Sequence, residues 1–176
     1  MILSARNNQF KFDFPRNFIP EPIAKKYKPF LKEPIDYWNY GIQSLNLPGP
    51  SFDAVTQVDY PGNQRAFRSS IPKQQLFDKT MTVTMQAFDG YVNYWMAIEM
   101  FDYYYKLSGK HPYLPEGVGV QMLDADGTIF VTVQLKDMFI SEVGALDLNF
   151  SSNTIEFQTF DITFGYNVLD VVVNID

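Results

Sequence analysis

The chain has 176 residues, a formal net charge of −6 and no cysteine. This length favours a single domain spanning residues 1–176, and an apolar content of 46% is enough for a real core. The lack of cysteine excludes a disulfide framework and any thiolate metal site or nucleophile, and it fits assembly in a reducing cytoplasm. The first residues lack the apolar stretch of a secretion signal, and no run approaches the roughly 18 apolar residues of a membrane span. We therefore expect neither export by the general route nor membrane insertion.

Charge is unevenly distributed along the chain. Residues 1–40 contain seven Lys or Arg against four Asp or Glu, whereas residues 41–176 contain seven against sixteen. Binding of phosphates needs clustered basic side chains, so the acidic second part argues against adhesion to nucleic acid. Solubility alone is the other explanation of the same charge.

The first predicted element is a strand over 10–14, because Phe10, Phe12 and Phe14 fall on one face of an alternating run. Residues 15–38 follow and contain five prolines. Proline removes a donor from a sheet ladder and favours extended backbone. We therefore expect an extended N-terminal arm, inserted after the first strand.

Residues 47–78 form a second segment without a periodic pattern, and it is long for a connection inside a compact domain. Its apolar side chains, which are too many for a disordered linker, include Phe52, Val55, Val58, Tyr60 and Phe67. We therefore expect an ordered loop that reaches out to a partner.

A threonine-rich strand at 80–87 precedes the one predicted helix, at 89–107, for which Asp89 is a suitable N-cap. Its polar positions Glu99, Asp102 and Lys106 form a narrow stripe, and aromatic or apolar residues cover the rest. A surface helix of a monomer normally has a wider polar face. Two explanations stay open: the helix plugs the end of a barrel, or its tyrosine-bearing flank packs on a neighbouring subunit.

The C-terminal third alternates again. Residues 118–135 are two alternating runs around an Asp-Ala-Asp-Gly turn, which predicts a hairpin. Apolar residues then alternate at 146, 148 and 150, a turn follows at 151–153, and they alternate again at 155 and 157. The phase then slips, because the apolar residues of the last run are at 160, 162 and 164. A slip of one residue predicts a bulge or a strand that passes between two sheets, as in a sandwich or a barrel.

Catalytic motifs are not evident. His111 is the only histidine and precedes a proline, which argues against a histidine metal cluster or a Ser-His-Asp arrangement. Asp124 and Asp126 suggest a calcium loop, but the twelfth position is Leu135 where a bidentate Glu is needed. The glycines at 117–119 lack the spacing of a phosphate-binding loop. We expect no enzyme, no metal and no cofactor.

The segment SEVGALDLNFSSNTIEFQTFDITFGY resembles the end of the tail tube proteins of contractile-tailed bacteriophages. The family pattern is matched by Val143-Gly144, the alternating run 146–150, the turn at 152–153 and the final strand 159–166. Upstream, the long loop, the threonine-rich strand and the helix occur in the family's order. The resemblance covers residues 40–170.

This resemblance implies a mainly β fold: an antiparallel sandwich or barrel of the tail tube type with one flanking α-helix, shared with type six secretion tubes. It implies a homo-oligomer of hexameric rings, stacked into a hollow tube in the virion and assembled in the host cytoplasm. Tail sheath and baseplate proteins would be partners, and the tape measure protein and DNA would occupy the lumen without sequence-specific binding. Continuation of a sheet between subunits would close its edges.

The resemblance also implies roles for particular residues. The loop 47–78 matches the inter-ring stacking loop in position, so its Arg65, Arg68, Phe67 and Tyr60 are predicted inter-ring contacts. On the helix, the predicted inter-subunit contacts are Tyr91, Trp95 and Tyr104. The candidate lumen charges are Asp147, Glu156 and Asp161. Strand parity leaves open whether their face lines the lumen, where they would keep DNA from sticking, or points toward the sheath.

Three alternatives stay open. The long proline-rich stretch departs from the family and is compatible with a tube initiator ring at the baseplate. A tube protein of a related contractile injection system fits the same pattern. A carbohydrate-binding jelly roll is the more remote alternative, in which Tyr37, Trp38 and Tyr40 would stack on sugar rings.

Overall fold

The computed structural model describes residues 9–47, 49, 55–59, 62–67, 79–107, 113–146, 148 and 157–173. The strands are β1 Phe10–Phe12, β2 Ile42–Asn46, β3 Val55–Asp59, β4 Asn63–Phe67, β5 Thr80–Gln86, β6 Val118–Leu123, β7 Ile129–Lys136, β8 Phe139–Val143, β9 Thr159–Gly165 and β10 Val168–Val173. The helices are η1 Arg16–Phe18 (3-10), α1 Glu21–Tyr27, α2 Pro34–Tyr40, η3 Asp89–Tyr91 (3-10) and α3 Val92–Leu107.

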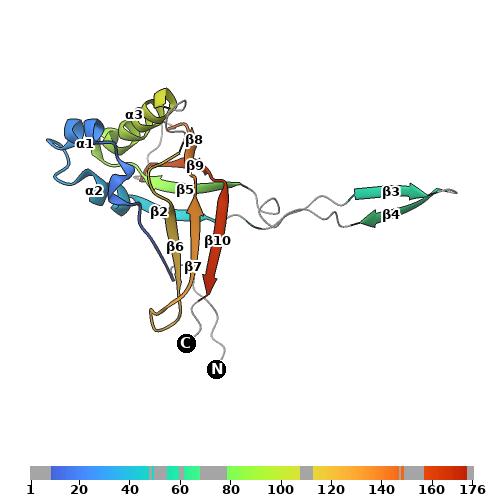
Figure 1. Cartoon of the computed structure of the whole chain (residues 1–176). Helices are drawn as coiled ribbons and strands as arrows, with labels where there is room; N and C mark the ends of the chain where they lie inside the picture. The colour runs from blue at the N-terminus through green and yellow to red at the C-terminus, as the bar shows by residue number, and fades with distance from the viewer. Residues whose placement is uncertain are drawn as a thin grey trace.

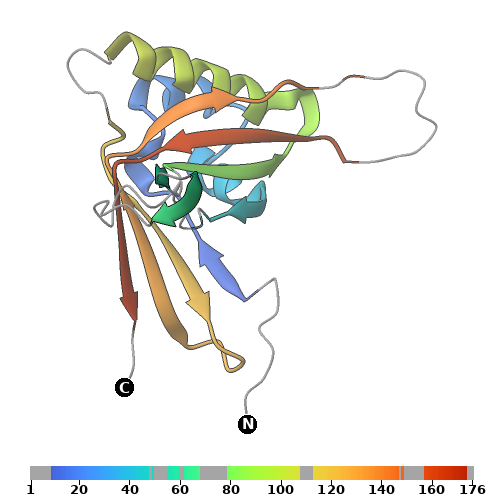
Figure 2. The same ribbon diagram turned by 90° about the vertical axis from the view of Figure 1, so that its right-hand side faces the viewer.

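Two four-stranded antiparallel sheets form the body. Sheet A has the order β1-β6-β7-β10 and sheet B the order β2-β5-β9-β8, while β3 and β4 pair only with each other (Figure 1). The strands of the two sheets run in steeply different directions, and the helices lie at one end of the sandwich (Figure 2). Neither sheet closes on itself, so the predicted sandwich is confirmed in its open form and a closed barrel is not formed.

Period-two alternation places the core between the sheets. On β5, Met81, Val83 and Met85 are buried and the intervening threonines are exposed or half-buried. These residues stand opposite the buried face of β9 in the pairs Met81↔Phe164, Val83↔Ile162 and Met85↔Phe160. Sheet A adds the buried residues Phe12, Val118, Val120, Val133 and Leu135. Burial of such side chains contributes about 1.5–3 kcal/mol each.

The predicted hairpin over 118–135 is confirmed as β6–β7. Asp124 organises its turn, because one carboxylate oxygen accepts the backbone N–H groups of Asp126 and Thr128, each at 2.9 Å. Gly127 follows with a φ of +84°, a conformation that other residues adopt only with strain.

The predicted helix over 89–107 is confirmed as η3 followed by α3. The N-cap is Phe88 and not Asp89, which is the first residue of η3, and no side chain makes a cap hydrogen bond there. Buried Asn93 ties the start of the helix instead. Its Oδ1 accepts the Phe88 N–H at 3.0 Å and its Nδ2 donates to the Gln86 carbonyl at 2.7 Å, which joins the helix to the end of β5.

The prediction of an extended arm over 15–38 is wrong. Most of this segment is η1, α1 and α2, and its prolines lie where helices accept them: Pro22 and Pro34 occupy first-turn positions. The segment belongs to the core, because Phe18 and Trp38 are 1% exposed. The Phe18 ring stacks on Phe14 with 4.2 Å between centroids. The described part of the chain therefore has three α-helices beside the sheets, and not one flanking helix.

Two further predictions need correction. The segment 47–78 is not a loop throughout, since β3 and β4 form a hairpin within it. The predicted strand over 146–150 is not formed at Leu146 and Leu148, and its other residues 147, 149 and 150 lie outside the described residues. The edge strand of sheet B is instead β8 at 139–143, and β10 completes sheet A. The phase slip falls at the entry to β9, which begins at Thr159.

Candidate assembly surfaces

The outward face of sheet B is polar and lacks cations. The strands β2, β5, β8 and β9 contain no Lys or Arg. Threonines dominate the outward positions of β5 and β9, and they pair across the strands: Thr82 and Thr163 hydroxyls lie 3.5 Å apart, and Thr84 donates to the Asp161 carboxylate at 2.7 Å. The face is therefore a layer of hydroxyl groups with a negative formal charge.

Asp161 is exposed on this face, as the alternation in 159–164 predicts. Exposed Glu142 on β8 joins it, standing opposite Thr163 in the sheet register. Sequence reasoning missed Glu142 because it did not identify residues 139–143 as a strand. The other two lumen candidates, Asp147 and Glu156, lie outside the described residues.

The two edge strands of sheet B, β2 and β8, each contain a register irregularity, between Ile42 and Ser44 and between Ile140 and Glu142. At the β8 edge the exposed Phe139 ring lies across Gly165, where an added Cβ would stand 2.2 Å from the ring. An edge strand leaves one row of backbone donors and acceptors available to another chain. Bulges at such edges bend the strand and restrict which partner strand can pair.

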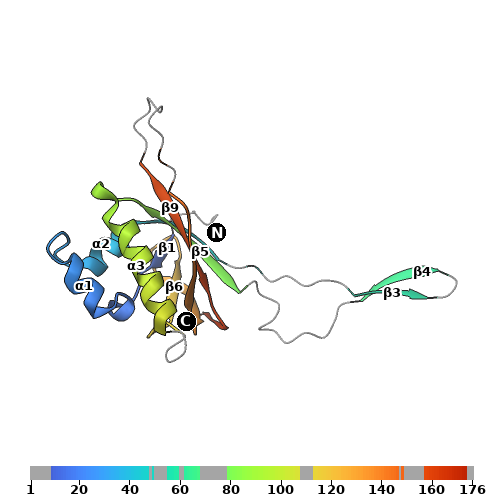
Figure 3. The ribbon, with the colours of Figure 1, turned by 90° about the horizontal axis from the view of Figure 1, so that it is seen from above.

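The β3–β4 hairpin projects far from the body (Figures 1 and 3). Its register runs from Val55↔Phe67 to Asp59↔Asn63, and Val58 is 62% exposed. Arg65 and Phe67 belong to β4, and their side chains lie outside the described part of the chain. Tyr60 and Arg68 also lie outside the described residues. An isolated two-stranded hairpin is marginally stable in water, so this one needs a surface to pack on.

Helix α3 presents an aromatic stripe to solvent. Trp95 is 55% and Tyr105 71% exposed, and Tyr91 is also exposed. Tyr91 and Trp95 therefore lie where an inter-subunit contact requires them. Tyr104 does not, because it is half-buried and its hydroxyl donates to the Phe18 carbonyl at 2.9 Å. Sequence reasoning did not single out Tyr105, which lies on a different side of the helix from Trp95, because they are ten residues apart.

Ionisable groups link α1 to α3. The Lys26 ammonium pairs with the Glu99 carboxylate, and it also lies 5.5 Å from the centre of the Tyr27 ring. Burial and then the hydrogen bond with Glu99 raise the pKa of Tyr27 to about 12. Burial and the neighbouring Tyr103 raise the pKa of Tyr104 to about 12. Both tyrosine hydroxyls therefore stay protonated at neutral pH and can donate hydrogen bonds between helical segments.

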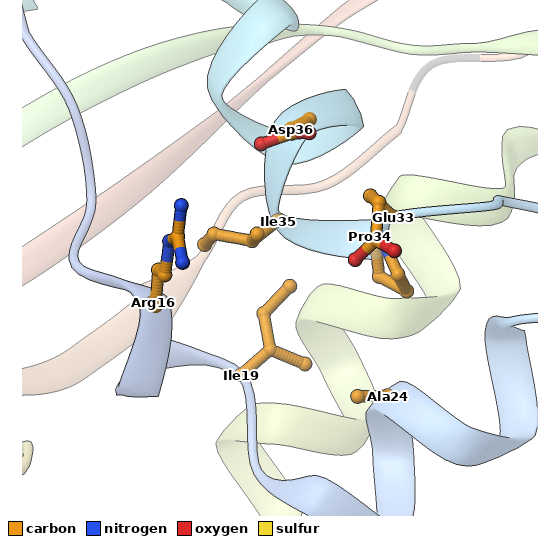
Figure 4. A pocket seen from close by; sticks show the side chains of 7 residues that line it. All are labelled: Arg16, Ile19, Ala24, Glu33, Pro34, Ile35 and Asp36. Atoms are coloured by element: carbon orange, nitrogen blue, oxygen red, sulfur yellow. The ribbon is translucent and has the colours of Figure 1, made fainter.

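Helix α2 carries two exposed aromatic residues, Tyr37 and Tyr40, next to a cavity. Tyr40 is 80% exposed and Tyr37 is also exposed, and both rings contact Phe88, with centroid distances of 6.4 and 6.2 Å. Trp38 is buried, so the predicted set of three sugar-stacking rings is reduced to two. A cavity of about 470 Å³ adjoins these two residues, lined by Arg16, Ile19, Ala24, Glu33, Pro34, Ile35 and Asp36 (Figure 4).

Other functional chemistry finds little support in the described part of the chain. There, no group of three or more His, Asp or Glu residues is placed to hold a metal ion. None of the described helices is both long and apolar enough to cross a membrane. The predicted calcium-like turn at Asp124 is accounted for by its own backbone hydrogen bonds.

No family model matches the chain, and no curated protein sequence matches it. Solved structures similar to it include the PVC sheath/tube terminator of an extracellular contractile injection system in the extended state. The identity is 15% and the TM-score 0.49, covering 75% of this chain and 85% of that one. A chain of the PVC sheath-tube complex aligns at 15% identity and TM-score 0.48, covering 78% and 81%.

The tube-terminating cap of the anti-feeding prophage aligns at 14% identity and TM-score 0.47, covering 76% of this chain and 80% of that one. A crystal structure of an Hcp protein aligns at 15% identity and TM-score 0.33. At these identities and TM-scores, the likeness alone assigns neither a family nor an activity to this chain. The chain is thus similar in structure to tube and cap proteins of contractile injection systems.

Proposed function

We propose that the chain is a structural subunit of a contractile tail, which forms hexameric rings that stack into the hollow inner tube. The observation that carries this proposal is the outward face of sheet B, a largely polar surface, rich in threonine on β5 and β9, whose strands hold no cation. A polar surface without cations suits the wall of a channel better than a site that binds an anionic ligand.

The wall would arise by continuation of sheet B from subunit to subunit. Its edges are β2 and β8, so the β8 edge of one copy would meet the β2 edge of the next around a closed ring. Asp161 and Glu142 would then repeat around the lumen. The aromatic stripe of α3, with Trp95 and Tyr105, is available for a further contact between neighbours or with the sheath.

The lumen chemistry follows from the electrostatics of DNA. Protein–DNA affinity comes largely from cations that replace the counterions of phosphates. A wall of threonine hydroxyls with Asp161 and Glu142 offers no such cation, so DNA would pass without sticking. We infer a phage tail tube for DNA ejection, in a virion assembled in the host cytoplasm, with sheath, baseplate and tape measure proteins as partners. A baseplate-proximal initiator ring or a tube of a related injection system would use the same surfaces.

Stacking would depend on the β3–β4 hairpin. It is the one described element that extends beyond the body, and its length suits contact with a second ring (Figure 3). Arg65, Phe67 and, beyond the described residues, Tyr60 and Arg68 remain the proposed contacts. Replacement of Arg65 and Arg68 by Glu would weaken stacking while the rings persist.

Negative-stain electron microscopy over a range of protein concentrations tests the proposal. Six-fold rings or hollow filaments are the expected result, and preformed tube or baseplate is added where the protein stays dispersed. A protein that neither forms rings alone nor extends such a nucleus is not a tube subunit. Binding to a glycan array by that dispersed protein would favour the carbohydrate-binding alternative, for which exposed Tyr37 and Tyr40 are the specific observation.

A further inference from the structure

The face of α2 that carries Asp36, Tyr37 and Tyr40, together with the cavity beside it, is here termed the α2 face. Tyr40 and Tyr37 give it an apolar aromatic surface supported by Phe88. Asp36 lies where this surface meets the cavity, since it lines both. Asp36 is exposed and takes part in no ion pair among the described residues. An aromatic surface beside an unpaired carboxylate favours a basic side chain on an apolar support.

The α2 face and the β3–β4 hairpin lie at opposite ends of the molecule. In Figure 1 α1 and α2 are on the left and the hairpin is on the right, and Figure 3 shows the same separation from above. The hairpin of one copy therefore lies away from its own α2 face. A second copy displaced along the hairpin direction would bring its α2 face to the hairpin tip.

The hairpin supplies the complementary groups. It contains one arginine within its described strands, Arg65 on β4. It also exposes an apolar side chain, Val58, which stands opposite Gln64 in the register and therefore lies on the other face of the hairpin from Arg65. The hairpin and the α2 face each have apolar surface that a partner would cover.

We propose that the α2 face receives the β3–β4 hairpin of a second copy, in which Arg65 pairs with Asp36 beside the Tyr40 ring. The proposal rests on the proposed function and identifies the receiving surface for stacking. It also gives the helical segment 16–40 a role, since η1 and the two helices build this face. The contact is heterologous, so its repetition gives a filament, or a ring where the rotation closes, and not a two-fold pair.

Cysteine cross-linking tests the contact directly, because the chain has no native cysteine. A variant with Asp36→Cys and Arg65→Cys, oxidised under assembly conditions, should give a ladder of disulfide-linked multimers on non-reducing gels. The matched control combines Arg65→Cys with Asp126→Cys, which is exposed in the β6–β7 turn, and should give none. Equal ladders, or no ladder from protein that forms filaments, would overturn the proposal.

Charge reversal keeps the test independent of cysteine chemistry. Asp36→Arg and Arg65→Asp should each shorten filaments at least tenfold, and the double variant should restore much of the length. Tyr40→Ala should shorten them, whereas Phe30→Ala, which truncates another exposed aromatic residue, should not. Rings that stack normally in all variants would refute this contact alone. A disulfide ladder without six-fold rings would refute the proposed function and leave the contact standing.

Discussion

The Tyr104 hydroxyl donates a 2.9 Å hydrogen bond to the Phe18 carbonyl, and it thereby ties α3 to the segment that leads into α1. Phe18 is 1% exposed and stacks on Phe14, so the tie reaches the centre of the core. Lys26 and Glu99 form a second link between the same layers. The helical end of the molecule is therefore fixed to the sandwich by polar contacts as well as by packing.

Replacement of Tyr104 by Phe should destabilise the fold by about 1 kcal/mol at neutral pH, because a half-buried hydrogen bond is lost. Chemical denaturation measures this loss. Tyr105→Phe, at an exposed position of the same helix, is the control and should leave stability unchanged.

The tyrosine pKa values also predict a loss of stability in alkali. Burial raises the pKa values of Tyr27 and Tyr104 in the folded chain to about 12, from an ordinary tyrosine value of about 10. The unfolded chain therefore loses these protons first, and the stability they contribute below pH 10 falls as pH rises toward 12. Melting temperatures over this range should fall less steeply in Tyr104→Phe than in the wild type. An identical slope in both proteins would contradict the assignment.

Gly117→Ala should destabilise the sandwich by about 1–3 kcal/mol, the usual cost of forcing an added carbon against its neighbours. A Cβ at this position would stand 2.4 Å from the Leu135 carbonyl oxygen, which belongs to rigid backbone. Gly119→Ala is the matched control two residues on, where the nearest atom would be 4.0 Å away. The melting temperatures of the two variants should differ clearly. Equal melting temperatures would mean that the β7 backbone moves away from the added Cβ without loss of stability.

The exposed stripe of α3 should matter for assembly and not for folding. Trp95→Ala and Tyr105→Ala should change the stability of the dispersed protein by less than about 0.5 kcal/mol, as is usual for surface positions. In sedimentation velocity both should reduce the fraction of protein in rings or in complexes with the sheath. Variants that assemble as the wild type does would remove α3 from the interface.

Asp161→Lys should make the tube adhesive for nucleic acid. The substitution places a cation on the threonine face, and repeated cations bind phosphates with an affinity that falls as salt rises. Retention of a single-stranded oligonucleotide by sedimented tubes, measured at several salt concentrations, gives the comparison. Asp126→Lys changes net charge equally but lies in the β6–β7 turn. Equal retention by both variants would mean that the sheet B face is not the lumen wall.

Period-two and helical patterns predict much of the fold. The alternation in 80–87 and 118–135 and the long apolar helix at 89–107 correspond to β5, the β6–β7 hairpin and α3. The helices at 21–27 and 34–40 were missed because proline counts against a helix only inside it, and Pro22 and Pro34 stand in first turns. The strand β8 was missed because bulging at its edge breaks the alternation between Ile140 and Glu142.

The exposure of a candidate residue is predictable where its position in a strand or helix determines it. It is not predictable where packing against a distant segment determines it. Asp161 follows from strand parity and Trp95 from helical position, and both are exposed. Tyr104 and Trp38 look like surface aromatics in sequence, but contacts with a distant segment turn them inward. The α2 face depends on helices that the sequence does not predict, because the prolines in this segment argue against helix. No local pattern therefore indicates it.

The measurement that tests the central claim most directly is a cryo-electron microscopy reconstruction of the assembled protein. A hollow tube of six-fold rings is the result we expect, with sheet B continuous around the lumen through its β2 and β8 edges and Asp161 facing the channel. A solid filament, an assembly with sheet B facing outward, or rings joined only through sheet A would contradict the account.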